Sequence, residues 1–166
     1  NSQIRGLRQA ERNAEDGLST VQTAESYLEK TSEILQRIRV LAVQASNGTY
    51  TDSDRSLMHQ EVKNLIDEVD RIASQAQYNG MNLFDGSLSR KTAKGGLVFH
   101  LGPNQDQREK VTIEDMTTRG LNLMTKGGEL TIDISTGSGA NRGIGVISDA
   151  LKLITKQRSD LGSNYM

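Results

Sequence analysis

The apolar and small residues between Leu7 and Ala45 repeat every seven positions in two columns that are offset by three residues. A 3.5-residue period keeps both columns on one side of a helix, as in the seam of a coiled coil. At 1.5 Å per residue this helix would span roughly 60 Å, whereas a compact globule of this size has a diameter of about 40 Å. The pattern therefore predicts a rod. The first column contains Leu7, Ala14, Val21, Leu28, Leu35 and Ala42, and the second contains Ala10, Gly17, Ala24, Thr31, Ile38 and Ala45.

A second helix is predicted directly after a short break. Asn47-Gly48 favours the end of the first helix, and the polar residues 51–54 supply an N-cap for the next one. Helices joined by so short a connection usually run antiparallel, so the second helix should lie back along the first. We expect it to end at Asn79-Gly80. Its apolar residues step by four and three through Met58, Val62, Leu65, Val69, Ile72 and Ala76.

The residues after the two helices lose the helical repeat and predict a loop and short strands. Residues 82–96 contain Gly, Ser and Lys and indicate a surface loop. Residues 97–101 and 110–113 read as two short strands around a turn that holds the only Pro, and residues 129–134 alternate like a third strand. Residues 116–124 fit a brief helical turn. The economical interpretation is one small antiparallel sheet.

The chain returns to helical spacing near its end. A third helix is predicted from about Asn141 to beyond Ser163, with Ile147, Ile154 and Leu161 on its apolar face. The predicted fold is therefore mainly α with a small β element, an elongated rod of two long antiparallel helices, a β region and a returning helix. We expect one domain, with rod helices in 1–81, the linker and β region in 82–140 and the last helix in 141–166.

Composition narrows the possible functions. Lys and Arg number 20 against 21 Asp and Glu, so bulk charge does not favour a nucleic acid. The chain has no Cys, which excludes disulfides and thiol catalysis, and no stretch approaches the ~20 apolar residues of a membrane span. Both ends are abrupt, lacking caps or stop signals, so we expect a fragment of a longer protein.

One segment invites a catalytic interpretation. The glycine-rich residues Ser138 to Gly145 lie between a predicted strand and a predicted helix, where a dinucleotide-binding loop belongs, and resemble the glycine segment of short-chain dehydrogenases. Only 21 residues follow Gly145 in the 166-residue chain, too few for the rest of such an enzyme. We expect a flexible helix start there. His59 and His100 lie on different elements without metal-ligand spacing, so we predict no metal, no cofactor and no enzyme.

Three segments carry a family resemblance. Residues 4–17 (IRGLRQAERNAEDG) and 35–48 (LQRIRVLAVQASNG) closely resemble the N-terminal region of bacterial flagellins, and residues 156–162 (KQRSDLG) resemble the start of the flagellin C-terminal signature. Residues 99–108 look most like spirochaete core-filament flagellins. The resemblance implies a rod domain folded in the order derived above, lacking the disordered terminal arms that become helical in the filament's inner tube.

The resemblance also implies a role and partners. A flagellin is the structural subunit of the flagellar filament, self-assembling with other flagellin subunits for motility. Further implied partners are an export chaperone, the Toll-like receptor that senses flagellin monomers, and filament sheath proteins. The implied location is a periplasmic flagellum if the chain is spirochaetal and an extracellular filament otherwise.

The resemblance also implies that particular residues contact the receptor. Receptor-active flagellins use the first rod helix and an acidic residue of the second, which here match Gln36, Arg37, Leu41, Gln44 and Glu61. The same surface would also meet the next protofilament. Leu41 neighbours the seam residue Ala42, so packing inside the rod and outward contact stay open. Val40 departs from the family, where many members carry Glu.

Two other function classes stay open from the residues alone. A coiled-coil adaptor or chaperone explains the heptads but not the flagellin-like segments. A nucleotide-binding enzyme acting through Ser138 to Gly145 would bind a nicotinamide cofactor saturably, which calorimetry would detect.

Overall fold

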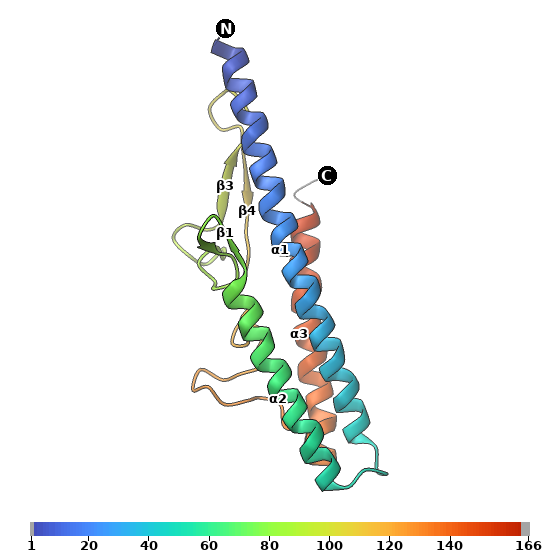
Figure 1. Cartoon of the computed structure of the whole chain (residues 1–166). Helices are drawn as coiled ribbons and strands as arrows, with labels where there is room; N and C mark the ends of the chain where they lie inside the picture. Colours follow the sequence, from blue (N-terminus) through green and yellow to red (C-terminus); the bar gives the residue numbers. More distant parts are fainter. Residues whose placement is uncertain (1, 164–166) are drawn as a thin grey trace.

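The structure, a computed structural model, describes residues 2–163 and shows an elongated rod (Figure 1). Helix α1 (Ser2–Ser46) runs the length of the rod, and helices α2 (Asp52–Gln75) and α3 (Gly137–Ser163) run back alongside it. The short strands β1 (Gln77–Tyr78), β2 (Met81–Asn82), β3 (Leu97–His100) and β4 (Arg108–Val111) lie beside α1 in the half of the rod that holds its N-terminus. The predicted mainly helical rod with a small β element is confirmed.

The heptad seam is buried where helices face it. Every residue of the second column is buried, and the first column is buried from Val21 onward. Leu7, at 55% exposed, and Ala14 lie at the surface instead. These two residues are exposed because α3 is shorter than α1. Arg158, near the described end of α3, lies 3.6 Å from Glu25 of α1. The first turns of α1 lie beyond that point.

Strands β3 and β4 cover part of this N-terminal half of α1. A Cβ placed at Gly17 would lie 3.2 Å from Cγ of Phe99, so the glycine lets the aromatic ring approach the helix closely. Nearby, the side-chain amide of Asn13 donates to the backbone oxygen of His100 at 2.9 Å. The small residues of the first half of α1 therefore serve packing against a strand as well as the helix seam.

The break between α1 and α2 is held by capping groups. Arg55 donates through Nε to the backbone oxygen of Ala45 (2.7 Å) and through Nη2 to that of Asn47 (3.0 Å), which satisfies carbonyls at the end of α1. Thr51 is the N-cap of α2 and forms a capping box with Asp54. The hydrogen bond from the Thr51 side chain holds the pKa of Asp54 below its ordinary value. The predicted N-cap is confirmed.

The end of α2 differs from the prediction. The helix ends at Gln75, and Asn79-Gly80 forms the turn of the β1–β2 hairpin, in which Tyr78 pairs with Met81. Asn79 (φ 48°) and Gly80 (φ 76°) both have positive φ, which a two-residue type I′ turn requires. Asn79-Gly80 therefore marks a hairpin turn and not the end of α2.

Residues 82–96 are not the surface loop that their composition suggested. Leu83, Phe84 and Leu88 are buried in the core, and Phe84 packs edge-on against Tyr27 of α1 with ring centroids 6.5 Å apart. The backbone also joins the body of the rod, since the Leu83 amide donates to Ala76 at 2.8 Å. The prediction was wrong because three apolar side chains without a period can still fill a core.

The predicted single sheet is two separate two-stranded antiparallel sheets. Strands β3 and β4 confirm the expected pair, with Val98 opposite Lys110. The expected third strand at 129–134 is absent and only an isolated bridge joins Leu130 to Met124. Its alternation instead places Ile132 and Ile134 in the core. Residues 117–122 form hydrogen-bonded turns, including Leu121 N–H to the Thr117 oxygen at 2.9 Å.

Helix α3 begins at Gly137, earlier than the expected Asn141. Its expected continuation beyond Ser163 lies outside the described residues. Gln157, only 3% exposed, fixes α3 to the β region. Its amide donates to the Thr112 backbone oxygen at 3.0 Å and its Oε1 accepts from the Glu114 backbone N–H at 3.1 Å. One side chain thereby satisfies two backbone groups that follow β4.

Candidate interaction surface

Arg37 and Glu61, two of the five residues named from the flagellin resemblance, contact each other. The Arg37 Nε donates to Oε1 of Glu61 at 2.9 Å, joining α1 to α2. Arg37 lies outside both seam columns, so its side chain lies over the helix pair and not within it. Both side chains are largely exposed, at 55% and 43%, and are open to a partner.

Gln36 and Gln44 also lie at the surface of α1. The Gln44 amide donates to the hydroxyl of Tyr50 at 2.8 Å, so this side chain lies over the loop between α1 and α2. The hairpin therefore places four of the five expected contact residues at its exposed surface, and whether a partner binds them stays a prediction.

Leu41 differs from the other four residues. It is only 3% exposed and belongs to the core cluster that runs along the rod. The structure thus decides the alternative that the sequence left open, because a buried side chain packs within the rod and offers little surface to a partner.

Most of the exposed large apolar residues lie toward the two ends of the rod, and the others among the described residues are Leu18, Met81 and Leu153. Near the α1–α2 turn the exposed fractions are 55% for Val40, 50% for Val43 and 73% for Leu57. Sequence reasoning had noted Val40 only for its missing charge. The available signal was that Val40 and Val43 fall outside both seam columns. Toward the opposite end the exposed apolar residues are Ile4 and Leu7 in the first turns of α1, and Val98 and Leu101 in and directly after β3.

The glycine-rich residues 138–145 form the first turns of α3 and not a loop. The Gly139 amide donates to Oγ1 of Thr136 at 3.1 Å, and a Cβ at Gly139 would overlap the backbone oxygen of Asp133. A Cβ at Gly143 would lie 3.2 Å from Cγ2 of Ile132. The expected helix start is present, and these two glycines let α3 pack closely against residues 132–134.

The two histidines lie on different elements, His59 in α2 and His100 in β3. His59 in α2 accepts a long hydrogen bond from the Ile134 amide (3.5 Å) and lies 3.9 Å from Asp133. Burial holds the pKa of His59 below its ordinary value of 6.5, Lys63 also lowers it and Asp133 opposes the shift. Within the described residues 2–163, no group of three His, Cys, Asp or Glu side chains could hold a metal ion.

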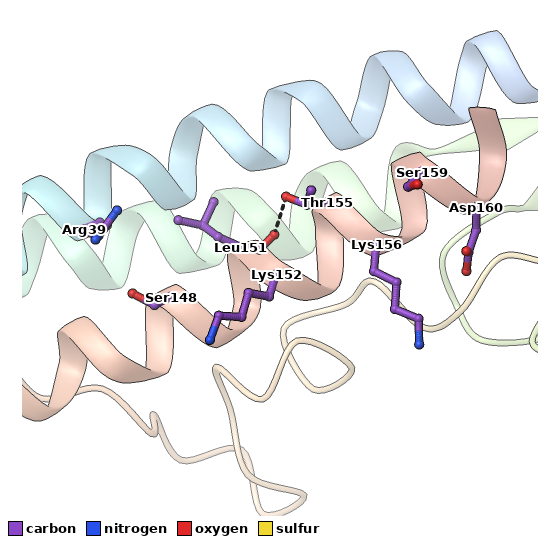
Figure 2. Close-up of a pocket in the computed structure, with 8 residues that line it drawn as sticks. All are labelled: Arg39, Ser148, Leu151, Lys152, Thr155, Lys156, Ser159 and Asp160. Atoms are coloured by element: carbon purple, nitrogen blue, oxygen red, sulfur yellow. Dashed lines mark hydrogen bonds between the residues drawn. The ribbon is translucent and has the colours of Figure 1, made fainter. Parts of the chain in front are cut away.

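A shallow groove of about 670 Å³ runs between α1 and α3 (Figure 2). Arg39 lies on the α1 side, whereas Lys152 and Lys156 extend from α3. Asp160 supplies the one carboxylate among the lining residues, and its Oδ2 lies 3.5 Å from Nη2 of Arg90. The groove is open, and its charged side chains suit a surface contact better than a small apolar ligand.

A family model describes the chain's first half. The bacterial flagellin N-terminal helical region matches residues 1–89, which cover α1, α2 and the first hairpin. The chain belongs to the bacterial flagellin family. In the part of this flagellin chain that the structure describes, no helix is long and apolar enough to cross a membrane.

Individual relatives agree with this family. The chain is 49% identical over 98% of its length to the flagellar filament 31.3 kDa core protein of Treponema maltophilum. It is 50% identical over 96% of its length to a flagellar filament core protein of Brachyspira hyodysenteriae. The crystal structure of Bacillus cereus flagellin superimposes with a TM-score of 0.75 at 27% identity, covering 92% of this chain and 81% of that one. This flagellin chain spans only 58% and 57% of the two curated relatives.

Proposed function

We propose that this flagellin chain is the rod portion of a structural subunit that self-assembles into a bacterial flagellar filament and serves motility. The observation that carries the proposal is the distribution of exposed apolar residues, most of which lie toward the two ends of an elongated rod. Val43 lies in the last turn of α1 and Leu57 in the second turn of α2, whereas Ile4 lies in the first turn of α1 and Leu101 directly follows β3. Exposed apolar patches mark interaction sites, and two different patches on one molecule favour an open head-to-tail assembly.

The names of the relatives support the same proposal. The Treponema and Brachyspira proteins are called flagellar filament core proteins, and the chain matches them over almost its whole length. A coiled-coil adaptor explains the heptad seam but not this similarity. An enzyme acting through residues 138–145 would need a loop where α3 has its first turns.

The location follows from the same relatives. We infer a place in the flagellar filament, and, because the relatives at 45–50% identity come from Treponema and Brachyspira, specifically in a periplasmic flagellum. Sheath proteins would then surround the filament, and an export chaperone would accompany the unassembled subunit.

The flagellin-sensing Toll-like receptor is a further proposed partner of the free subunit. Its contact would centre on Gln36, Arg37, Gln44 and Glu61, which are accessible on the hairpin. Val40 supplies no carboxylate for an ion pair, so we expect weak recognition. A periplasmic filament would also rarely meet the receptor.

Electron microscopy of the full-length protein that contains this chain tests the structural role. Purified protein should form filaments after salt-induced assembly, and residues 1–166 alone should remain monomeric if the terminal arms are required. Replacing Val43 and Leu57 with Ser should hinder assembly without changing helicity, because the rod end would lose apolar contact surface. Full-length protein that never polymerises would contradict the proposal, and fibres of residues 1–166 would show that rod contacts suffice.

A further inference from the structure

Two Asn-Gly pairs occur in the chain, and the structure surrounds them differently. In such a pair the backbone nitrogen of the glycine can attack the side-chain carbonyl carbon of the asparagine, because glycine has no Cβ to hinder the approach. Asn47-Gly48 lies in the loop that joins α1 to α2 at one end of the rod (Figure 1), and Asn79-Gly80 forms the turn of the β1–β2 hairpin. All four residues are exposed to water.

The side-chain carbonyl of Asn47 is held and polarised by its own loop. Its Oδ1 accepts a hydrogen bond from the Thr49 amide at 3.3 Å, which closes an Asx turn over Gly48. A donor on this oxygen stabilises the negative charge that the oxygen acquires when a nucleophile attacks the carbon. The Thr49 amide therefore makes Cγ of Asn47 a better electrophile.

The nucleophile, the backbone nitrogen of Gly48, is free and activated. Among residues 2–163 its N–H donates no hydrogen bond, and a Cβ at Gly48 would meet nothing within 4 Å, so the space around it is open. The carbonyl of the same peptide group, that of Asn47, accepts from Nη2 of Arg55 at 3.0 Å and from the Tyr50 amide at 3.3 Å. A guanidinium on this oxygen draws electron density from the peptide group and stabilises the deprotonated nitrogen that attacks.

Asn79-Gly80 lacks both of these aids. Within the described part of the chain, no hydrogen bond reaches the side-chain oxygen of Asn79 and no arginine contacts its backbone carbonyl. Its backbone is also fixed by the hairpin, in which Tyr78 pairs with Met81 and both turn residues have positive φ. The second pair is thus a reference for the first within one molecule.

We propose that Asn47 is a site of spontaneous deamidation, which Arg55 and the Thr49 amide promote. The Gly48 nitrogen forms a bond to Cγ of Asn47, and the side-chain nitrogen leaves as ammonia, taking up the proton that the Gly48 amide loses. Water then adds to one of the two carbonyl carbons of the cyclic imide, and the bond between that carbon and the ring nitrogen breaks. The ring nitrogen takes one proton of the water, and the new carboxylate releases the other to solvent.

The position of Arg55 favours one of the two products. Addition of water at Cγ gives aspartate, whereas addition at the backbone carbonyl carbon gives isoaspartate and leaves that carbon as a free carboxylate. The backbone carbonyl is the group that Arg55 contacts, so the guanidinium stabilises the isoaspartate carboxylate. The main chain then passes through the former side chain and gains a methylene between α1 and α2. Isoaspartate at this position alters the end of the rod that carries the exposed Val43 and Leu57.

Incubation of the full-length protein in mildly alkaline buffer, followed by peptide mass spectrometry, tests this modification. Asn47 should lose its side-chain nitrogen roughly tenfold faster than Asn79, because only Asn47 has the two hydrogen-bonded carbonyls. An isoaspartate-specific methyltransferase should label the peptide that contains residue 47. A rate at Asn47 equal to or below the rate at Asn79 would overturn the proposal, and a product that contains only aspartate would overturn the part assigned to Arg55 in choosing the product.

Two variants separate the nucleophile from the guanidinium. Gly48→Ala should slow deamidation of Asn47 roughly tenfold, because the new Cβ hinders the attack although the loop has room for it. Arg55→Gln should slow it severalfold, since Gln can donate to the same carbonyl but carries no charge. Circular dichroism should show unchanged helicity in both variants.

Arg71→Gln is the matched control for Arg55→Gln, because Arg71 lies on the same helix and pairs with Glu68 at the surface, away from the loop. It should deamidate at Asn47 like wild type. A wild-type rate in Gly48→Ala would overturn the intramolecular attack. A rate in Arg55→Gln that equals or exceeds that of wild type would overturn the promotion by Arg55.

Discussion

Arg37 in α1 reaches across the hairpin to Glu61 in α2, 24 positions further along the chain, with 2.9 Å between Nε and Oε1. Both side chains are well exposed, so water screens the pair and its contribution to folding is at most about 1 kcal/mol. The pair therefore adds little to the stability of the fold, and both side chains are available to a binding partner.

Arg37→Ala should lower the free energy of unfolding by less than about 1 kcal/mol, because only an exposed ion pair is lost. If Arg37 is a hot spot of the receptor contact, the same change should weaken binding of the Toll-like receptor by about 1–3 kcal/mol. Urea denaturation and surface plasmon resonance measure the two effects. Arg39→Ala, on the same helix but away from Glu61, is the control. Unchanged receptor binding in the Arg37 variant would remove this residue from the contact, and no wild-type binding at micromolar concentration would refute recognition.

Gln157→Ala should lower the free energy of unfolding by about 2–4 kcal/mol, because the Glu114 amide and the Thr112 carbonyl each lose a buried partner. Denaturant unfolding followed by circular dichroism measures the change. The adjacent Lys156→Ala is the control and should stay within about 0.5 kcal/mol of wild type, because its side chain is exposed. Equal stability of the two variants would show that Gln157 does not anchor the β region to α3.

Two glycines of α3 should respond to Ala in opposite ways. Gly145→Ala should stabilise the protein by up to about 1 kcal/mol, because its Cβ would meet nothing within 4 Å and Ala favours the helix. Gly139→Ala should destabilise it by more than about 1 kcal/mol, because its Cβ would overlap the Asp133 backbone oxygen. Thermal melts compare the two directly. Stabilisation by both substitutions would mean that α3 does not pack tightly on residues 132–134.

Acid should weaken the docking of residues 129–136 on α2. The pKa of His59 in the folded protein lies below 6.5, chiefly because burial disfavours the charged ring. The unfolded chain therefore binds the proton more readily, so stability is complete above pH 6.5 and is lost as the pH falls below it. Asp133 adds a loss at lower pH, because hydrogen bonds from Ser135 lower its pKa.

Melting temperatures measured between about pH 7.5 and pH 5.5 test this dependence. The decline should be shallower in His59→Asn, whose side-chain oxygen can accept from the Ile134 amide without titrating. His100→Asn is the control, because it replaces an exposed histidine on a different element, β3. Parallel curves for wild type and His59→Asn would contradict the assignment.

The helices could be predicted from the sequence because their signals are periodic and local. The seven-residue columns defined α1 and its buried side, and Thr51 marked the start of α2, since an N-cap acts within one helical turn. Segments without a periodic pattern were predicted less well. Asn79-Gly80 can end a helix or turn a hairpin, and the choice depends on whether Tyr78 and Met81 can pair.

Of the candidate contact residues, the sequence identified Gln36, Arg37, Gln44 and Glu61 through family resemblance, but it could not show that Arg37 and Glu61 meet or that Leu41 is buried. The sequence by itself determined that this protein is a helical rod, because the buried side of a helix requires apolar residues at regular intervals in every turn, and these intervals can be read from the sequence. Only the tertiary structure decided where residues 82–136 pack, which end of α1 remains exposed and which charges face solvent. Those features depend on contacts between segments that are far apart in the chain. The packing of the whole rod decides which residues meet there, and the neighbouring residues in the sequence do not.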